Sequence, residues 1–309
     1  MIKRTIFISS DAYLRTKHKQ LIIDFADKEK KPASIPIEDI GVIVLEGYQM
    51  TISLNLISSM LDNNVAIITC DNRKMPQGLM LNLEGNTLQQ ERFRAQVNAS
   101  VPLKKQLWQQ TVKAKIRNQG QLLSKYQILP AYKSGVPQNF EQWRNSVRSG
   151  DPDNLEGRAA AYYWKSIFNE YIPGFVRGRE MAPPNNLLNY GYAILRALTA
   201  RSLVASGLLP TLGIHHHNRY NAYALADDIM EPYRPFVDKI VYGIVAVKKD
   251  TQDFELTKEL KAELLQIPAM DVKIDGEISP LMIAMQRTTT SVSRCFEGFQ
   301  RKILYPELK

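Results

Sequence analysis

Three histidines and three acidic residues gather in one short stretch of the chain, between positions 213 and 231. Imidazole nitrogens and carboxylate oxygens are common protein ligands of divalent cations. The stretch predicts either a metal site or, on the plainer interpretation, a polar loop followed by a helix with an acidic first turn. Asp228 and Glu231 lie three residues apart, so a helix would bring them to the same face. The six residues are His215, His216, His217, Asp227, Asp228 and Glu231.

A further carboxylate comes from earlier in the chain. Glu156 lies just after Asn154, which opens a predicted helix, and alone it is explained as a first-turn acid that stabilises the helix dipole. Combined with a loop histidine and paired acids, it gives a mixed nitrogen and oxygen ligand set. Because oxygen dominates and no cysteine contributes, the set favours Mg²⁺ or Mn²⁺ over Zn²⁺. Such ions support phosphoryl transfer, because they orient a phosphodiester and activate an attacking hydroxyl.

A basic window runs from Arg92 to Asn139 without a single Asp or Glu. Uncompensated positive charge of this kind neutralises nucleic-acid phosphates. The net charge of +9 and the pI near 9.3 agree with a polyanionic partner. The alternative is a solvated basic helix face. We expect backbone contacts with nucleic acid from Arg92, Arg94, Lys104, Lys105, Lys113, Lys115 and Arg117; Lys125 and Lys133 continue the window.

The bulk properties are those of a globular protein. The 309 residues suffice for one large or two ordinary domains, and 44% of them are hydrophobic. No apolar run of about 18 residues exists, so no membrane span is expected. The N-terminal sequence alternates between apolar and polar residues, and a charged residue interrupts it too early for a signal peptide. Cys70 and Cys295 are too few for a disulfide framework, and a reducing cytoplasm is the expected location.

The residues up to about position 80 read as a small β domain. Short runs of β-forming residues alternate with turn signals, and one helix interrupts them. No Gly-rich phosphate loop follows a strand, which argues against a nucleotide-binding α/β domain. The expected strands cover 5–8, a hairpin of 12–15 and 20–25, one or two strands within 35–45, and 65–69, with a further one at 79–83; the helix covers 53–61.

A connection at 81–100 leads to a larger domain, 101–309, which we expect to be all-α and to hold the site. The fold class is therefore predicted as α+β. Gly207 and Pro210 end an apolar helix that begins near 185. Pro232 and Pro235 predict an early kink in the helix from 224 to 247. The other expected helices cover 89–101, 103–126, 140–149, a segment from 154, 256–265 and 279–304.

Four stretches, in this order, resemble the CRISPR-associated (Cas) integrase-endonuclease family, number one in the Cas nomenclature. They are NLEGRAAAYYW from Asn154, NNLLNYGYAILR from Asn185, GLLPTLGIHH from Gly207 and DDIMEPYRPFVD from Asp227. The tail QRTTTSVSRCFEGFQRKILYPELK and the connection around Arg177 resemble the branch that accompanies single-protein RNA-guided effector nucleases, the type II systems.

The resemblance implies that Glu156, His216 and Glu231 are the catalytic residues and hold Mg²⁺ or Mn²⁺. The family's Gly-x-x-His pattern, counted from Gly213, selects His216; His215 and His217 flank it and remain alternatives. Asp228 matches a further acid near the metal. Asp227 has no such match and is expected to be a solvated first-turn acid.

The resemblance also implies the reaction and the assembly. The 3′-hydroxyl of prespacer DNA would attack a phosphodiester of the CRISPR repeat, so double-stranded DNA is the expected substrate. A homodimer would form through the β domains, and two dimers would flank a dimer of a small companion adaptation protein in a heterohexamer. Two rivals stay open: a metal-dependent DNA-repair nuclease and a non-catalytic DNA-binding protein.

Overall fold

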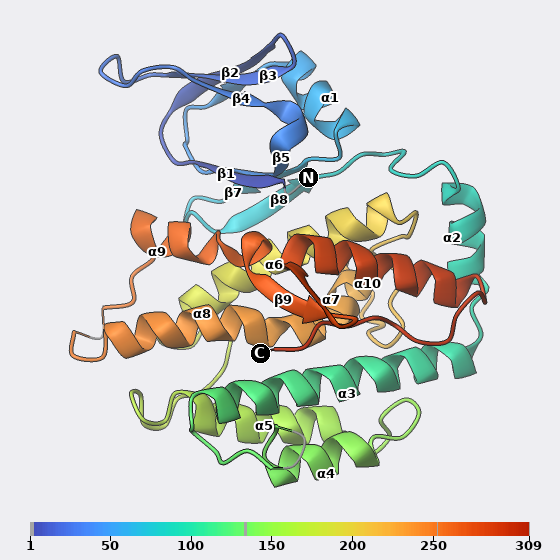
Figure 1. Ribbon diagram of the computed structural model, residues 1–309. Coiled ribbons are helices and arrows are strands. Elements are labelled where there is room, and N and C mark those ends of the chain that lie inside the picture. Colours follow the sequence, from blue (N-terminus) through green and yellow to red (C-terminus); the bar gives the residue numbers. More distant parts are fainter. Residues whose placement is uncertain (1–2, 133–134, 252, 309) are drawn as a thin grey trace. The chain divides into compact units, whose positions relative to one another are not determined.

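The computed structural model describes residues 3–132, 135–251 and 253–308 (Figure 1). Lys133 lies outside the described residues. The chain forms two compact units, one ending at Gln89 and the other beginning at Gln90. The first is rich in β structure and the second is mainly helical, so the molecule has the mixed α+β architecture predicted from the sequence.

The N-terminal unit contains a mixed four-stranded sheet in the order β1-β5-β7-β8. Its strands are β1 (Arg4–Ile8), β5 (Ile40–Leu45), β7 (Ala66–Cys70) and β8 (Pro76–Met80). β5 pairs in parallel with β1 and β7, while β7 and β8 are antiparallel. All but the last residue of β5 are buried, which explains its continuous apolar sequence.

The second sheet has the order β4-β3-β2-β6, from β4 (Ala33–Pro36), β3 (Gln20–Phe25), β2 (Ala12–Lys17) and β6 (Thr51–Ile52). The predicted hairpin is confirmed: β2 and β3 pair antiparallel across His18 and Lys19, both with positive φ, as tight hairpin turns require. Ser53 caps the helix α1 (Leu54–Asp62), accepting from the Leu56 amide at 3.4 Å. A 3-10 turn, η1 (Ile37–Asp39), precedes β5.

Helices dominate the C-terminal unit, and α3 packs against α4, α5, α8 and the 3-10 turn η2 (Glu231–Tyr233). Figure 1 shows α3, α4 and α5 side by side. Because α3 has neighbours along much of its length, it buries polar as well as apolar residues, Lys115 among them. The helices are α2 (Gln89–Val97), α3 (Val101–Lys125), α4 (Gln138–Ser146), α5 (Leu155–Ile167), α6 (Asn185–Ala205), α7 (Ala224–Met230), α8 (Arg234–Val247), α9 (Lys258–Leu264) and α10 (Leu281–Phe296).

The kink predicted at Pro232 and Pro235 is a complete break. α7 ends at Met230, the 3-10 turn η2 (Glu231–Tyr233) follows, and α8 starts at Arg234. A proline lacks the amide hydrogen and its ring clashes with the preceding turn, so the α-helical ladder cannot run through this point. Asp228 therefore lies before the break and Glu231 at its start.

The expectation of an all-α C-terminal domain is wrong in one place. β9 (Asp271–Ile274) and β10 (Glu277–Pro280) form an antiparallel hairpin just before α10, after the 3-10 turn η3 (Ile267–Ala269). Asp275 and Gly276 make the turn with φ of 51° and 83°. An Asp-Gly pair between alternating β-branched residues is a hairpin signal that the sequence does contain. Among the described residues, no helix is both long and apolar enough to cross a membrane.

Candidate active site

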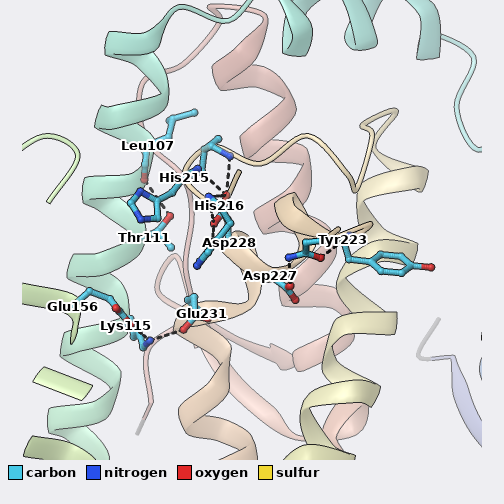
Figure 2. Close-up of polar contacts among 12 residues, drawn as sticks. Leu107, Thr111, Lys115, Glu156, His215, His216, Tyr223, Asp227, Asp228 and Glu231 are labelled. Atoms are coloured by element: carbon cyan, nitrogen blue, oxygen red, sulfur yellow. Dashed lines mark hydrogen bonds and ion pairs between the residues drawn. The ribbon is translucent and has the colours of Figure 1, made fainter. Parts of the chain in front are cut away.

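Glu156 lies in the first turn of α5. Figure 2 shows its side chain in contact with that of Lys115. Asn154 caps the helix, its side chain accepting from the Gly157 amide at 3.2 Å. The Asp151 carboxylate accepts from the amides of Leu155 and Glu156 at 3.0 and 2.9 Å. These contacts satisfy the helix's unpaired amides, so the backbone that carries Glu156 is held from two sides.

The ammonium of Lys115 joins Glu156 to Glu231. Its Nζ contacts Oε1 of Glu156 and lies 2.5 Å from Oε2 of Glu231. Lys115 is only 8% exposed. Burial would lower its pKa, but the charges of Glu231 and Glu156 outweigh burial and raise the pKa of Lys115. A buried, charged lysine thus lies between two carboxylates from different parts of the chain.

Glu231 has a second cationic partner. Nε of Arg234 donates to its Oε1 at 2.7 Å, and the guanidinium lies 4.5 Å from the ring centroid of Tyr192. Burial opposes the charged form, yet Arg234 and Lys115 lower the pKa of Glu231 to about 2. Oε2 of Glu231 forms the ion pair with Lys115. Glu231 is a buried carboxylate that stays ionised.

Asp228 holds the loop that carries His216. Its carboxylate is fully buried and accepts from the amides of Ile214 and His215 at 2.7 and 2.9 Å. Its Oδ1 bonds to Nδ1 of His216, and this hydrogen bond raises the pKa of His216 despite partial burial. With Nδ1 engaged, Nε2 of His216 remains for a ligand, the arrangement in which a carboxylate orients a metal-binding histidine.

The flanking residues have other partners. His215 stacks on Trp108 at 4.1 Å with nearly parallel rings, while His217 is exposed. The expectation that Asp227 is solvated is wrong: it is 7% exposed and pairs with Arg196 at 2.7 and 3.0 Å. The ion pair explains the burial, because a charge leaves water only with compensation.

The residues expected to hold a metal fit a divalent cation in kind. Oxygens of Glu156 and Glu231 meet at one cationic group, and a third carboxylate orients His216, which suits Mg²⁺ or Mn²⁺. In the described part of the chain, however, no three His, Cys, Asp or Glu side chains gather closely enough to hold a metal. The position between the two glutamates belongs to the Lys115 ammonium.

The basic window divides into two groups. Arg92 pairs with Glu297 at 3.5 Å, Arg117 pairs with Glu307 at 2.9 Å, and Lys115 is buried at the two glutamates. These three cations are compensated within the chain. The other described cations of the window are exposed or half-buried: Arg94, Lys104, Lys105, Lys113 and Lys125.

A cavity of about 300 Å³ adjoins Glu231. Lys115, Glu231 and Arg234 reach its wall, and Arg177, Arg179 and Trp164 complete much of the rest. The sequence did not assign Lys115, Arg177 or Arg234 to the carboxylate site. The spacing of three between Glu231 and Arg234 was a usable signal, because such pairs meet on one helical face.

Comparisons with known proteins identify the family of this chain. A family model described as CRISPR associated protein Cas1 matches residues 6–270. The CRISPR-associated endonuclease Cas1 of Neisseria meningitidis is 33% identical over 294 residues, which cover 94% of this chain and 91% of that protein.

Solved structures share the fold over nearly the whole chain. A casposase bound to an integration product superposes with a TM-score of 0.77 at 18% identity, covering 97% of this chain and 92% of that one. A chain of a Cas6-RT-Cas1–Cas2 complex gives a TM-score of 0.71 at 21% identity, covering 100% of this chain and 36% of that one. With a family model spanning most of its length, this chain belongs to the CRISPR-associated Cas1 family of endonucleases, as its four motifs predicted.

Proposed function

We propose that this chain is an integrase of CRISPR adaptation, which joins the 3′-hydroxyl ends of prespacer DNA to a phosphodiester of the CRISPR repeat. The observation that carries the proposal is the meeting of Glu156 and Glu231 at one cationic group, beside a cavity lined by arginines. The casposase neighbour, described as bound to an integration product, supports strand joining as the reaction.

In this proposal Glu156, His216 and Glu231 hold Mg²⁺ or Mn²⁺. When bound, such an ion lowers the pKa of an attacking hydroxyl and offsets negative charge on the transition state. Asp228 keeps the His216 ring oriented through Nδ1. Arg234 keeps Glu231 ionised and fixed in direction. Joining exchanges one phosphodiester for another, so the step needs no external energy source.

The proposed DNA surface follows α2 and α3. Arg94, Lys104, Lys105 and Lys113 would contact the duplex backbone by charge and shape rather than by base sequence. The β-rich unit would form a homodimer, and two dimers would flank a dimer of the small companion protein. The neighbour described as a Cas1–Cas2 complex supports such a companion. The C-terminal motifs favour the type II branch.

A joining assay tests the proposal. A labelled duplex with a 3′-hydroxyl is incubated with a repeat-bearing plasmid and Mn²⁺, and covalent joining is measured. His216→Ala should abolish joining and leave DNA binding largely intact, because only a ligand is removed. His217→Ala, at an exposed neighbour, should join normally. Joining by His216→Ala would show that the ligand assignment is wrong.

The same assay separates the rival functions. A repair nuclease would cut the plasmid in Mn²⁺ without forming a joined product. A non-catalytic DNA-binding protein would bind the duplex equally well with a chelator present and would leave both DNAs unchanged. Either result would reject the integrase proposal.

A further inference from the structure

We propose that the Lys115 ammonium is a resident cation of the site, which competes with the divalent ion for Glu156 and Glu231 until DNA binds. This inference rests on the proposed function, since it assumes that the two glutamates are metal ligands. It assigns to Lys115 a role that couples metal binding to DNA binding, in place of the backbone contact expected from the sequence.

The geometry provides the competition. Nζ of Lys115 contacts one oxygen of each glutamate, so any ion that uses these oxygens together must displace the ammonium. Oxygens of the two carboxylates converge there although they come from α5 and η2. Lys115 on α3 is buried and is held by charge on both sides. The lysine thus keeps the carboxylates together and occupies their shared position.

Charge explains why DNA would shift the competition. The two glutamates are balanced by Lys115 and Arg234, so an added divalent ion leaves the buried group with excess positive charge. Such an excess is costly at low dielectric unless an anion arrives. The cavity that Lys115 lines offers a place for that anion, because Arg177 and Arg179 also line it.

Arg177 is well placed to attract a phosphate. Its guanidinium donates to Asn185 and Asn189 at 2.9 Å, and both acceptors are neutral. It also lies over the rings of Trp164 and Tyr192, which fixes the plane of the guanidinium. A DNA phosphate in the cavity would meet this guanidinium and could receive the displaced Lys115 ammonium.

Calorimetric titration of Mn²⁺ into the full chain, with and without a short blunt DNA duplex, tests the coupling. In the wild type, DNA should tighten Mn²⁺ binding. Lys115→Met should bind Mn²⁺ without DNA about tenfold more tightly than the wild type, because the competing cation is gone. DNA should then raise the Mn²⁺ affinity of Lys115→Met much less than it raises the Mn²⁺ affinity of the wild type. As a second readout, Mn²⁺ should raise the thermal unfolding midpoint of the variant more than that of the wild type.

Two controls make the result specific. Lys165→Met removes an exposed lysine from α5, the helix that carries Glu156, and should leave Mn²⁺ affinity unchanged. Lys115→Arg keeps the positive charge, so this variant should bind Mn²⁺ without DNA as weakly as the wild type does. If Lys115→Met does not fold, Lys115→Gln, which keeps hydrogen-bond donors but no charge, should show the same tightening.

The outcomes separate this inference from the proposed function. Equal or weaker Mn²⁺ binding by the neutral Lys115 variants, while the wild type binds Mn²⁺ and Glu156→Gln does not, would overturn the role of Lys115 alone. An equal affinity of Glu156→Gln and wild type would overturn the metal site itself, and with it this inference.

Discussion

Gly213 allows the loop that carries His216 to approach the Asp228 carboxylate closely. A Cβ at Gly213 would lie 2.6 Å from the carbonyl oxygen of His216 and 2.8 Å from Oδ2 of Asp228. Neither atom can yield easily, since one is backbone and the other belongs to a buried carboxylate that accepts three successive amides of the loop. The absence of a side chain at Gly213 is what brings His216 and Asp228 together.

Gly213→Ala should therefore lower the free energy of unfolding by about 1–3 kcal/mol and reduce strand joining, because the loop must shift away from Asp228. Chemical denaturation and the joining assay measure the two effects. The matched control is Gly243→Ala in α8, where nothing lies within 4 Å of the added Cβ. Helix propensity predicts that this control is neutral or slightly stabilising. Equal effects of the two substitutions would contradict the close approach at Gly213.

At this scale the sequence could identify partners only along one segment. The Gly-x-x-His spacing pointed to His216, and the structure joins that histidine to Asp228 twelve residues later. The ion pair between Lys115 and Glu231 spans two distant elements and left no local pattern. In the sequence Lys115 is one more cation of a basic window, and only the packing of α3 reveals that it is buried.

Among the elements, α5, α6 and α8 are joined by one buried acid that also lines the cavity. Asp238 of α8 accepts from the hydroxyls of Tyr163 on α5, at 2.8 Å, and Tyr192 on α6. Burial raises the pKa of Asp238 to about 6, although the tyrosine hydroxyls and then the charges of Arg177 and Arg234 lower it. The carboxylate is therefore half-protonated near pH 6 in the folded state.

This raised pKa predicts a pH-dependent stability. Between about pH 4, the ordinary value of an aspartate, and about pH 6, the folded state binds more protons than the unfolded state, so the contribution of Asp238 to stability falls as pH rises. The loss should be on the order of 1–3 kcal/mol and complete above the folded pKa. Asp238→Asn should flatten the unfolding free energy across this interval, measured by denaturation at a series of pH values. A parallel pH profile for variant and wild type would contradict the assignment.

Local patterns predicted most elements but not their breaks. Turn residues announced the β2–β3 hairpin, apolar residues at helical spacing announced α1, and Asn154 announced α5, because these signals act within a few positions. The 3-10 turn at Glu231 was expected only as a kink, since two prolines do not determine how many α-helical hydrogen bonds are lost. The β9–β10 hairpin was missed where helical residues on both sides outweighed an Asp-Gly signal.

Across the whole molecule, the net charge of +9 is not evenly available to a partner. Part of the basic window forms ion pairs that hold the helical unit together, as at Arg117 and Glu307. Composition cannot separate these cations from exposed ones, because both have the same residue types. Solvent exposure makes the distinction and moves the proposed DNA surface to Arg94, Lys104, Lys105 and Lys113.

The proposed DNA surface can be tested by charge reversal. Changing Lys104, Lys105 and Lys113 together to Glu should weaken duplex binding and make the affinity less dependent on salt, because fewer counterions are released. For every phosphate that the variant no longer neutralises, the slope of log K against log salt should become shallower by roughly 0.9. The control reverses three lysines of the same unit outside the window, Lys165, Lys258 and Lys302, all exposed. It carries the same change in net charge, so a local backbone contact predicts a smaller loss of affinity for the control than for the test variant. Equal losses of affinity in both variants would mean that DNA responds to net charge alone, and the α3 surface would have no special role.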